Sequence, residues 1–139
     1  MKIEELTEYH GCLMNKENVW CIIKDRTTNY VKSLMKDIRL DGEPTYKFKS
    51  LPITKLRKHY VKLSSSYISS YCLIGNTVYS NRYLAEILSV IGKRNIELYQ
   101  RQEENYPLVI KVNNTIVCLA PVILSDDDKK IIPKIEDII

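Results

Sequence analysis

Glycine and histidine are scarce in this sequence, and several catalytic signatures are missing. Four glycines are spread over 139 residues, and none belongs to a GxGxxG pattern or to a phosphate-binding loop ending in Lys-Ser or Lys-Thr. No GxSxG nucleophile elbow occurs. His10 and His59 are the two histidines, so acid–base catalysis would depend on one of them or on carboxylates. We therefore expect a protein that binds a partner without catalysing a reaction and without a cofactor.

Long apolar runs are also missing. No stretch approaches the roughly 20 apolar residues that cross a bilayer. The segment 1–5 is acidic and has no apolar stretch behind it, unlike a signal peptide. We expect neither membrane association nor export, so the cysteines should be free thiols in the reducing cytoplasm. They are Cys12, Cys21, Cys72 and Cys118.

Acidic residues are absent from the whole stretch between Pro44 and Ala85, although the net charge of the chain is only +4. Such uneven charge indicates a basic surface with a polyanionic partner, most simply nucleic acid. The alternative is a solvated face whose acids come from elsewhere in the fold. The cations of this stretch are Lys47, Lys49, Lys55, Arg57, Lys58, Lys62 and Arg82.

The composition that remains is that of an ordinary globular protein. Hydrophobic residues make up 45% of the chain and charged residues 27%, which argues against disorder and against a coiled coil. A chain of 139 residues is long enough to bury one core. We expect a single α+β domain over residues 1–124, followed by an amphipathic tail at 125–139.

Two amphipathic helices are predicted, over residues 28–40 and 81–91. For the second helix, Ser80 is a suitable N-cap, and Gly92 can adopt the positive φ that often follows a last turn. In both segments the apolar residues recur at the spacing of one helical face. They are Tyr30, Val31, Leu34, Met35 and Ile38 in the first, and Tyr83, Leu84, Ile87, Leu88 and Ile91 in the second.

Strands are predicted around these helices. Residues 6–14 and 19–24 flank a turn-like tetrapeptide at 15–18. Residues 95–101, 108–112 and 115–119 also have strand character, and Asn113-Asn114 suits a tight hairpin turn because Asn tolerates positive φ. Between them, a short helix can follow Pro52, and residues 60–74 suit strands that lead to Gly75-Asn76.

The tail has isoleucines at the spacing of a helical stripe, with Pro133 in the first turn. Five isoleucines are too many to leave in water. Packing on the chain's own core is the commoner outcome; the alternative is docking on a neighbour or partner, with Ile131 and Ile135 as contacts. The five are Ile131, Ile132, Ile135, Ile138 and Ile139.

No metal site is predicted. His10, Cys12 and Cys21 are possible ligands, but zinc sites usually contain closely spaced cysteine pairs, and free cysteines more often fill apolar space. The acidic run 126–128 suits a divalent cation. Acids at the start of a helix are nevertheless favourable without a metal.

Four short motifs follow one another in the last third of the chain: YSNRYLAEIL at 79–88, IEL at 96–98, YPLVI at 106–110 and CLAPV at 118–122. In this order they resemble the closing half of a DNA sliding-clamp domain, as in the bacterial polymerase processivity clamp and proliferating cell nuclear antigen. A Tyr-Leu helix is followed there by a strand, a Pro-Leu strand and a last strand that ends in Ala-Pro or Met-Pro. The resemblance covers about 45 residues.

The resemblance implies basic helix faces that contact DNA phosphates without sequence preference. On the predicted helices these residues are Lys32, Lys36, Arg39, Arg82 and Lys93, although Glu86 interrupts the second stripe. It also implies an apolar site for partner peptides near the end of the domain, where this chain has Pro121, Val122, Ile123 and Leu124.

A second candidate DNA-binding segment does not depend on the resemblance. Residues 54–60 have the sequence TKLRKHY, and Tyr67 and Tyr71 follow, so that cations for phosphates are mixed with rings that can stack on bases. Tyrosines at strand spacing are also ordinary core and cross-strand residues. The basic residues here are Lys55, Arg57, Lys58 and Lys62.

Three kinds of protein remain open. A clamp ring contains six domains, so this single domain would need six copies or a mixed assembly. A winged-helix transcriptional regulator would place helix-turn-helix helices at 52–63 and 81–91, a helical segment at 60–74, and a wing at Asn113-Asn114. A structural or assembly protein would use the isoleucine-rich tail as its interface.

Overall fold

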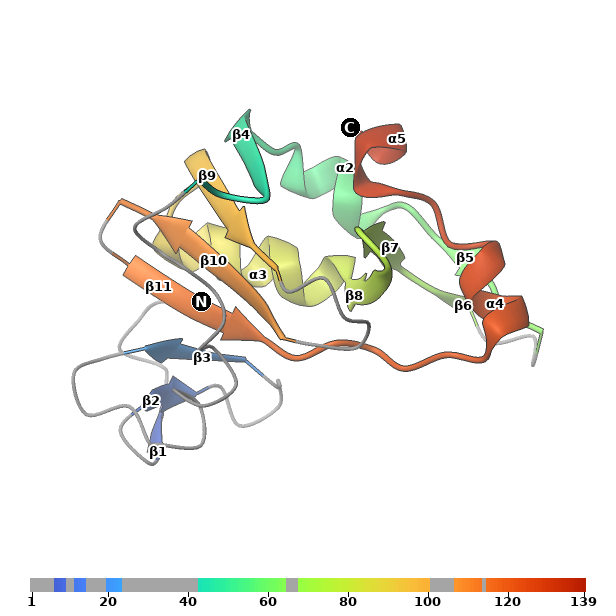
Figure 1. Ribbon diagram of the computed structural model, residues 1–139, viewed down its shortest axis with the longest axis horizontal. Coiled ribbons are helices and arrows are strands. Elements are labelled where there is room, and N and C mark those ends of the chain that lie inside the picture. The colour runs from blue at the N-terminus through green and yellow to red at the C-terminus, as the bar shows by residue number, and fades with distance from the viewer. Residues whose placement is uncertain are drawn as a thin grey trace.

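The computed structural model of the chain describes residues 7–9, 12–14, 20–23, 43–64, 68–100, 107–113 and 115–139 (Figure 1). For the first three segments it describes the strand pairing alone. The predicted helix at 28–40, the predicted turn at 15–18 and Tyr67 lie outside the described residues.

A seven-stranded sheet organises the described part of the chain, and its neighbouring strands pair antiparallel. Figure 1 shows β1 to β3 extending one side of the sheet beyond β11, with β4 beyond β9 on the other side. The order across the sheet is β1 (Thr7–Tyr9), β2 (Cys12–Met14), β3 (Trp20–Ile23), β11 (Thr115–Leu119), β10 (Leu108–Val112), β9 (Arg94–Tyr99) and β4 (Tyr46–Ser50).

Helix α3 (Asn81–Ile91) covers one face of this sheet, behind β9 to β11 in Figure 1. The predicted helix and both of its ends are confirmed. The Tyr83 N–H donates to Ser80 Oγ at 3.2 Å, and Gly92 has a φ of 131°. A Cβ on Gly92 would lie 2.9 Å from Val112 Cγ1, so glycine lets the chain pass close to β10 as it leaves the helix.

The main core lies between α3 and the sheet. Fully buried residues of α3 pack against alternate residues of β9, β10 and β11, as the periods of a helix and of a strand require. The contributing residues are Leu84, Ile87 and Leu88 from α3; Ile96 and Leu98 from β9; Leu108, Ile110 and Val112 from β10; and Val117 and Leu119 from β11.

The closing hairpin agrees with the prediction, whereas the first predicted strand does not. Strands β10 and β11 pair with Val112 opposite Thr115, and Asn113 has the positive φ of 54° that the tight turn demands. The predicted single strand 6–14 is instead two short strands, which pair with Tyr9 opposite Cys12. Glycine weakens a continuous strand, and pairing the two halves satisfies backbone groups that a single strand leaves to other partners.

The middle of the chain contains short elements, as predicted. They are α2 (Ile53–Arg57), β5 (Val61–Lys62), β6 (Ile68–Ser69), β7 (Tyr71–Ile74) and β8 (Thr77–Ser80), with β5 paired to β6 and β7 to β8. The described part of 60–74 therefore consists of strands and their connections. The winged-helix alternative required helix in this segment, so the fold contradicts it.

The tail packs on the chain's own core, but as two short helices rather than one. Helix α4 (Asp126–Lys130) ends before Pro133, whose missing N–H and ring prevent a continuous helix, and α5 (Ile135–Ile138) follows. Ile132, Ile135 and Ile138 are buried, which confirms self-packing. The prediction of Ile135 as a partner contact is wrong, because its side chain is 0% exposed.

Two further contacts attach the tail to the body. The Leu73 N–H donates to the Pro133 carbonyl at 2.8 Å, beside the connection between the two tail helices. Asp128 Oδ1 accepts from the Ser64 N–H at 2.8 Å, and this hydrogen bond holds the pKa of the Asp128 carboxyl below its ordinary value. Among the described residues, no helix is long and apolar enough to cross a membrane.

The Asp128 contact predicts a pH-dependent attachment of the tail. Because the folded pKa is lowered, the stabilisation is present above about pH 4, the region of the unfolded pKa, and is lost as the pH falls through the folded pKa. We expect Asp128→Ala to speed hydrogen exchange of the Ser64 amide at neutral pH and to remove this pH dependence. Asp127→Ala, an exposed neighbour on the same turn, is the matched control. Equal exchange in both variants would contradict the assignment.

Candidate nucleic-acid interface

An open cleft of about 870 Å³ lies where α2, the β6–β7 segment and α3 come together. It brings together two of the predicted DNA-binding residues, Arg57 and Arg82, which are far apart in the sequence. Its lining also contains tyrosines, serines and a single carboxylate. The lining residues are Arg57, Tyr60, Ile68, Ser69, Ser70, Tyr71, Ser80, Arg82, Tyr83, Glu86, Ser89 and Val122.

The amphipathic pattern of the two helices positions the arginines. Helices α2 and α3 pack against each other, with Leu56 and Leu84 fully buried. Arg57 directly follows Leu56, and Arg82 lies two residues before Leu84. Both arginines are exposed. On α3, Arg82, Glu86 and Ser89 recur at i, i+4 and i+7, so they share the face opposite the buried one. Burial of one helical face therefore presents the other to the cleft.

Hydrogen bonds fix the floor of the cleft. The Ser70 hydroxyl donates to the Leu56 carbonyl at 3.0 Å and accepts from Asn81 Nδ2 at 3.1 Å, while the Asn81 N–H donates to the Ser70 carbonyl at 3.0 Å. Asn81 is fully buried, so these bonds tie the start of α3 to α2 and to the β6–β7 segment. The walls that carry the arginines are thereby held in one arrangement.

The three tyrosines of the cleft differ in exposure. Tyr71 and Tyr83 are partly buried and pack against the two core clusters, which favours a structural role. Tyr60 is 64% exposed and lies two residues beyond Lys58, the C-cap of α2. It is therefore the aromatic ring in this cleft that is most available to a ligand.

The other predicted DNA-binding residues lie around the cleft or away from it. Lys55, Lys58 and Lys62 are exposed on α2, its C-cap and β5, in the same segment as Arg57. Lys93 is exposed beyond the C-terminal end of α3. A helical rise of about 1.5 Å per residue puts it about 16 Å from Arg82 along the helix axis. Lys32, Lys36 and Arg39 lie outside the described residues.

The predicted partner stretch is only partly exposed. Val122 pairs with Val78 through its backbone, and Val122 and Leu124 pack against a second, smaller core cluster. Pro121 is half-buried, whereas Ile123 is 73% exposed. In the tail, Ile131 is 48% exposed. Of the six predicted partner contacts, Ile123 and Ile131 thus keep the most accessible surface.

The acidic residues of α4 and the cysteines Cys72 and Cys118 lie at positions that favour a structural role. Asp126, Asp127 and Asp128 form the first turn of α4, where Ser125 caps the helix. Cys72 and Cys118 are buried, and burial, followed by the nearby Glu136 carboxylate, raises the pKa of Cys72 to about 12. That thiol stays neutral and is a poor nucleophile. Within the described residues, no group of three His, Cys, Asp or Glu side chains is arranged to hold a metal.

Sequence reasoning missed the contributions of Ile68, Ser69 and Tyr83 to the cleft. Nothing in the local sequence marks them, because their place depends on how β6 and the start of α3 meet. Tyr60 could be found from the sequence, since it is the last residue of the basic segment 54–60. Glu86 could be found as the residue that interrupts the basic stripe of the second predicted helix.

Helix α3 and strands β9, β10 and β11 follow one another in the order predicted for residues 81–119, a helix and then three strands. The last strand leads into Ala120-Pro121, as expected. No family model matches the chain, and neither does any curated protein or solved structure.

Proposed function

We propose that this chain is a non-catalytic, nucleic-acid-binding protein of DNA replication, built on a sliding-clamp-like domain. The observation that carries the proposal is the convergence of Arg57 and Arg82 on one cleft from two helices. Exposed lysines continue this basic surface along α2 and β5, at Lys55, Lys58 and Lys62. Guanidinium and ammonium groups on such a surface bind phosphates without sequence preference.

Charge in the surrounding sequence supports this assignment. The chain has no Asp or Glu from Pro44 to Ala85, the segment that contains α2, β5, β6 and the start of α3. Glu86 is the one carboxylate among the described residues that line the cleft. The described lining thus contains two arginines and one carboxylate, and this excess of positive charge favours a polyanion.

Removal of the two arginines is expected to weaken binding to duplex DNA and to reduce its salt dependence. We expect the magnitude of the slope of log K against log salt to fall by about two in Arg57→Ala/Arg82→Ala, because two phosphate contacts are lost. Fluorescence anisotropy with a labelled duplex over a range of salt concentrations measures both quantities. Both side chains are exposed, so the fold should be retained.

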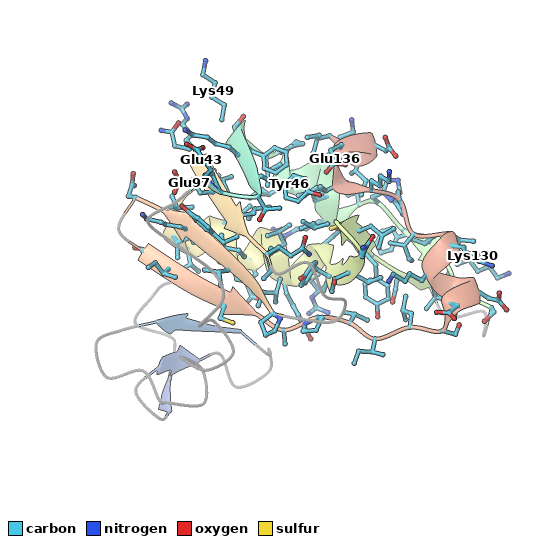
Figure 2. All side chains as sticks on the ribbon, in the orientation of Figure 1. Glu43, Tyr46, Lys49, Glu97, Lys130 and Glu136 are labelled. Atoms are coloured by element: carbon cyan, nitrogen blue, oxygen red, sulfur yellow. The ribbon has the colours of Figure 1, made fainter. Side chains whose placement is uncertain are left out.

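Lys47→Ala/Lys49→Ala is the matched control, since it removes the same charge from the exposed edge strand β4. Figure 2 shows Lys49 pointing outward from the molecule. Equal losses in both double variants would mean that net charge alone governs binding, and the cleft would lose its assigned role. An unchanged slope in the arginine variant would mean that Arg57 and Arg82 do not contact phosphates, and the cleft would again lose its assigned role.

A partner site is the second part of the proposal. The stretch Pro121–Leu124 with Ile131 offers apolar surface, of which Ile123 is the most exposed residue. A six-domain ring would require six copies of this chain or a mixed assembly. Light scattering over a range of concentrations distinguishes a six-copy ring from a monomer or dimer.

The buried thiols Cys72 and Cys118 support a reducing, cytoplasmic location.

A further inference from the structure

We propose that the cleft receives an unpaired nucleic-acid strand, with a base stacked on Tyr60 and the adjacent phosphates bound by Arg57 and Arg82. This inference rests on the proposed function, because it assigns the ligand of the same cleft. It adds a preference for unpaired over duplex strands, which phosphate contacts alone do not give.

The exposure of Tyr60 is the first argument. Its side chain is 64% exposed and belongs to neither core cluster, whereas Tyr71 and Tyr83 in the same cleft pack against those clusters. An exposed tyrosine presents a large, rigid, amphipathic ring whose apolar area is covered when a flat ligand stacks on it. Stacking on a base is sequence-tolerant, because every base has a π-face.

The position of the ring within a cleft is the second argument. In a duplex, the faces of the bases are stacked on one another and are not available to a side chain. A base becomes accessible to an aromatic ring when the strand is unpaired. The cleft of about 870 Å³ lies within the size range of small-molecule sites, so it has room for a splayed nucleotide.

Charge and shape supply the third argument. The guanidinium groups of Arg57 and Arg82 come from two different helices and line the same cleft as Tyr60, so the phosphates of a strand stacked on that ring have two cations to bind. Ile68 and Val122 add apolar lining suited to the sugar. The internal hydrogen bonds of Ser70 and Asn81 hold the floor in place before the ligand arrives.

The test compares a labelled oligothymidylate of about 12 nucleotides with a duplex of equal length, using anisotropy and the full chain. We expect tighter binding of the single strand. Tyr60→Leu, which keeps an apolar side chain but removes the ring, should weaken single-strand binding about tenfold, the effect of losing one stacking platform, and weaken duplex binding by a smaller factor. Tyr60→Phe keeps the ring and should bind like the parent. An oligouridylate compared with an oligodeoxyuridylate of the same length, which has the same base, shows whether the sugar matters.

The possible results separate this inference from the proposed function. In one outcome, single and double strands bind equally, Tyr60→Leu has no effect and Arg57→Ala/Arg82→Ala weakens binding. That outcome would overturn the stacking site and leave phosphate binding intact. Binding of neither nucleic acid at low salt would overturn both. Competition by polyglutamate as strong as that by the oligonucleotide, with no effect of Tyr60→Leu, would reduce the cleft to a general anion surface and also overturn the inference.

Discussion

Ile135→Ala is expected to lower the free energy of unfolding by about 2 to 5 kcal/mol, the range for truncating a buried aliphatic side chain. Ile135 is 0% exposed and belongs to the main core cluster, although it lies in the tail. Ile131→Ala, four residues earlier in the same tail, is the matched control. Its side chain is 48% exposed, so its replacement should change the stability by less than about 0.5 kcal/mol.

Urea denaturation of both variants, followed by circular dichroism, measures the difference. Equal, small effects would mean that the tail does not contribute to the core. That outcome would revive the tail as an interface, the role that its isoleucine stripe also suggested. A large effect of Ile131→Ala that depends on protein concentration would point to self-association through the exposed part of the tail.

Gly75→Ala is expected to cost about 2 to 4 kcal/mol, since it adds backbone strain and disturbs two partly buried hydrogen bonds of Gln100. Gly75 has a φ of 62° in the turn between β7 and β8, where a side chain is strained. A Cβ there would collide with Gln100 Oε1. Gln100 Nε2 donates to the Ile74 carbonyl at 2.6 Å and to the Tyr79 hydroxyl at 3.2 Å. Displacing Gln100 would therefore weaken contacts to a fully buried tyrosine.

A double-mutant cycle separates the two causes. If the collision contributes, Gly75→Ala should cost less in a Gln100→Ala background, because the obstructing side chain is gone. Asn76→Ala, at the exposed neighbouring position, is the control for any change in the turn. A cost of Gly75→Ala that is equal in both backgrounds would assign the whole effect to backbone strain.

Local elements were predictable from the sequence. The helix at 81–91 has an apolar stripe, a serine at its N-cap and a glycine after its last turn, and all three signals act within a few residues. The hairpin of β10 and β11 follows from Asn113-Asn114 between β-branched strands. The break within residues 6–14 was not predicted, because alternation alone does not show whether a strand continues or folds back.

The sequence identified several residues of the candidate site but not their position relative to one another. The sequence alone identified Arg82 as a cation on the polar side of a predicted helix, and Arg57 as part of the basic segment 54–60. It did not bring them together, since they belong to separate helices whose packing depends on long-range contacts through Leu56 and Leu84. The contribution of Ile68 and Ser69 depends on the same packing.

The sequence by itself determined the α+β class, the bounds of α3, the final hairpin and the basic character of residues 44–85, because short-range periodicity, capping and charge encode these features. Tertiary structure decided the order of the strands, the burial of Ile135 rather than Ile131, and the meeting of two arginines and Tyr60 at one cleft. These features depend on which apolar faces pack together. Packing between segments that are distant in the sequence determines this, and no local sequence pattern specifies it.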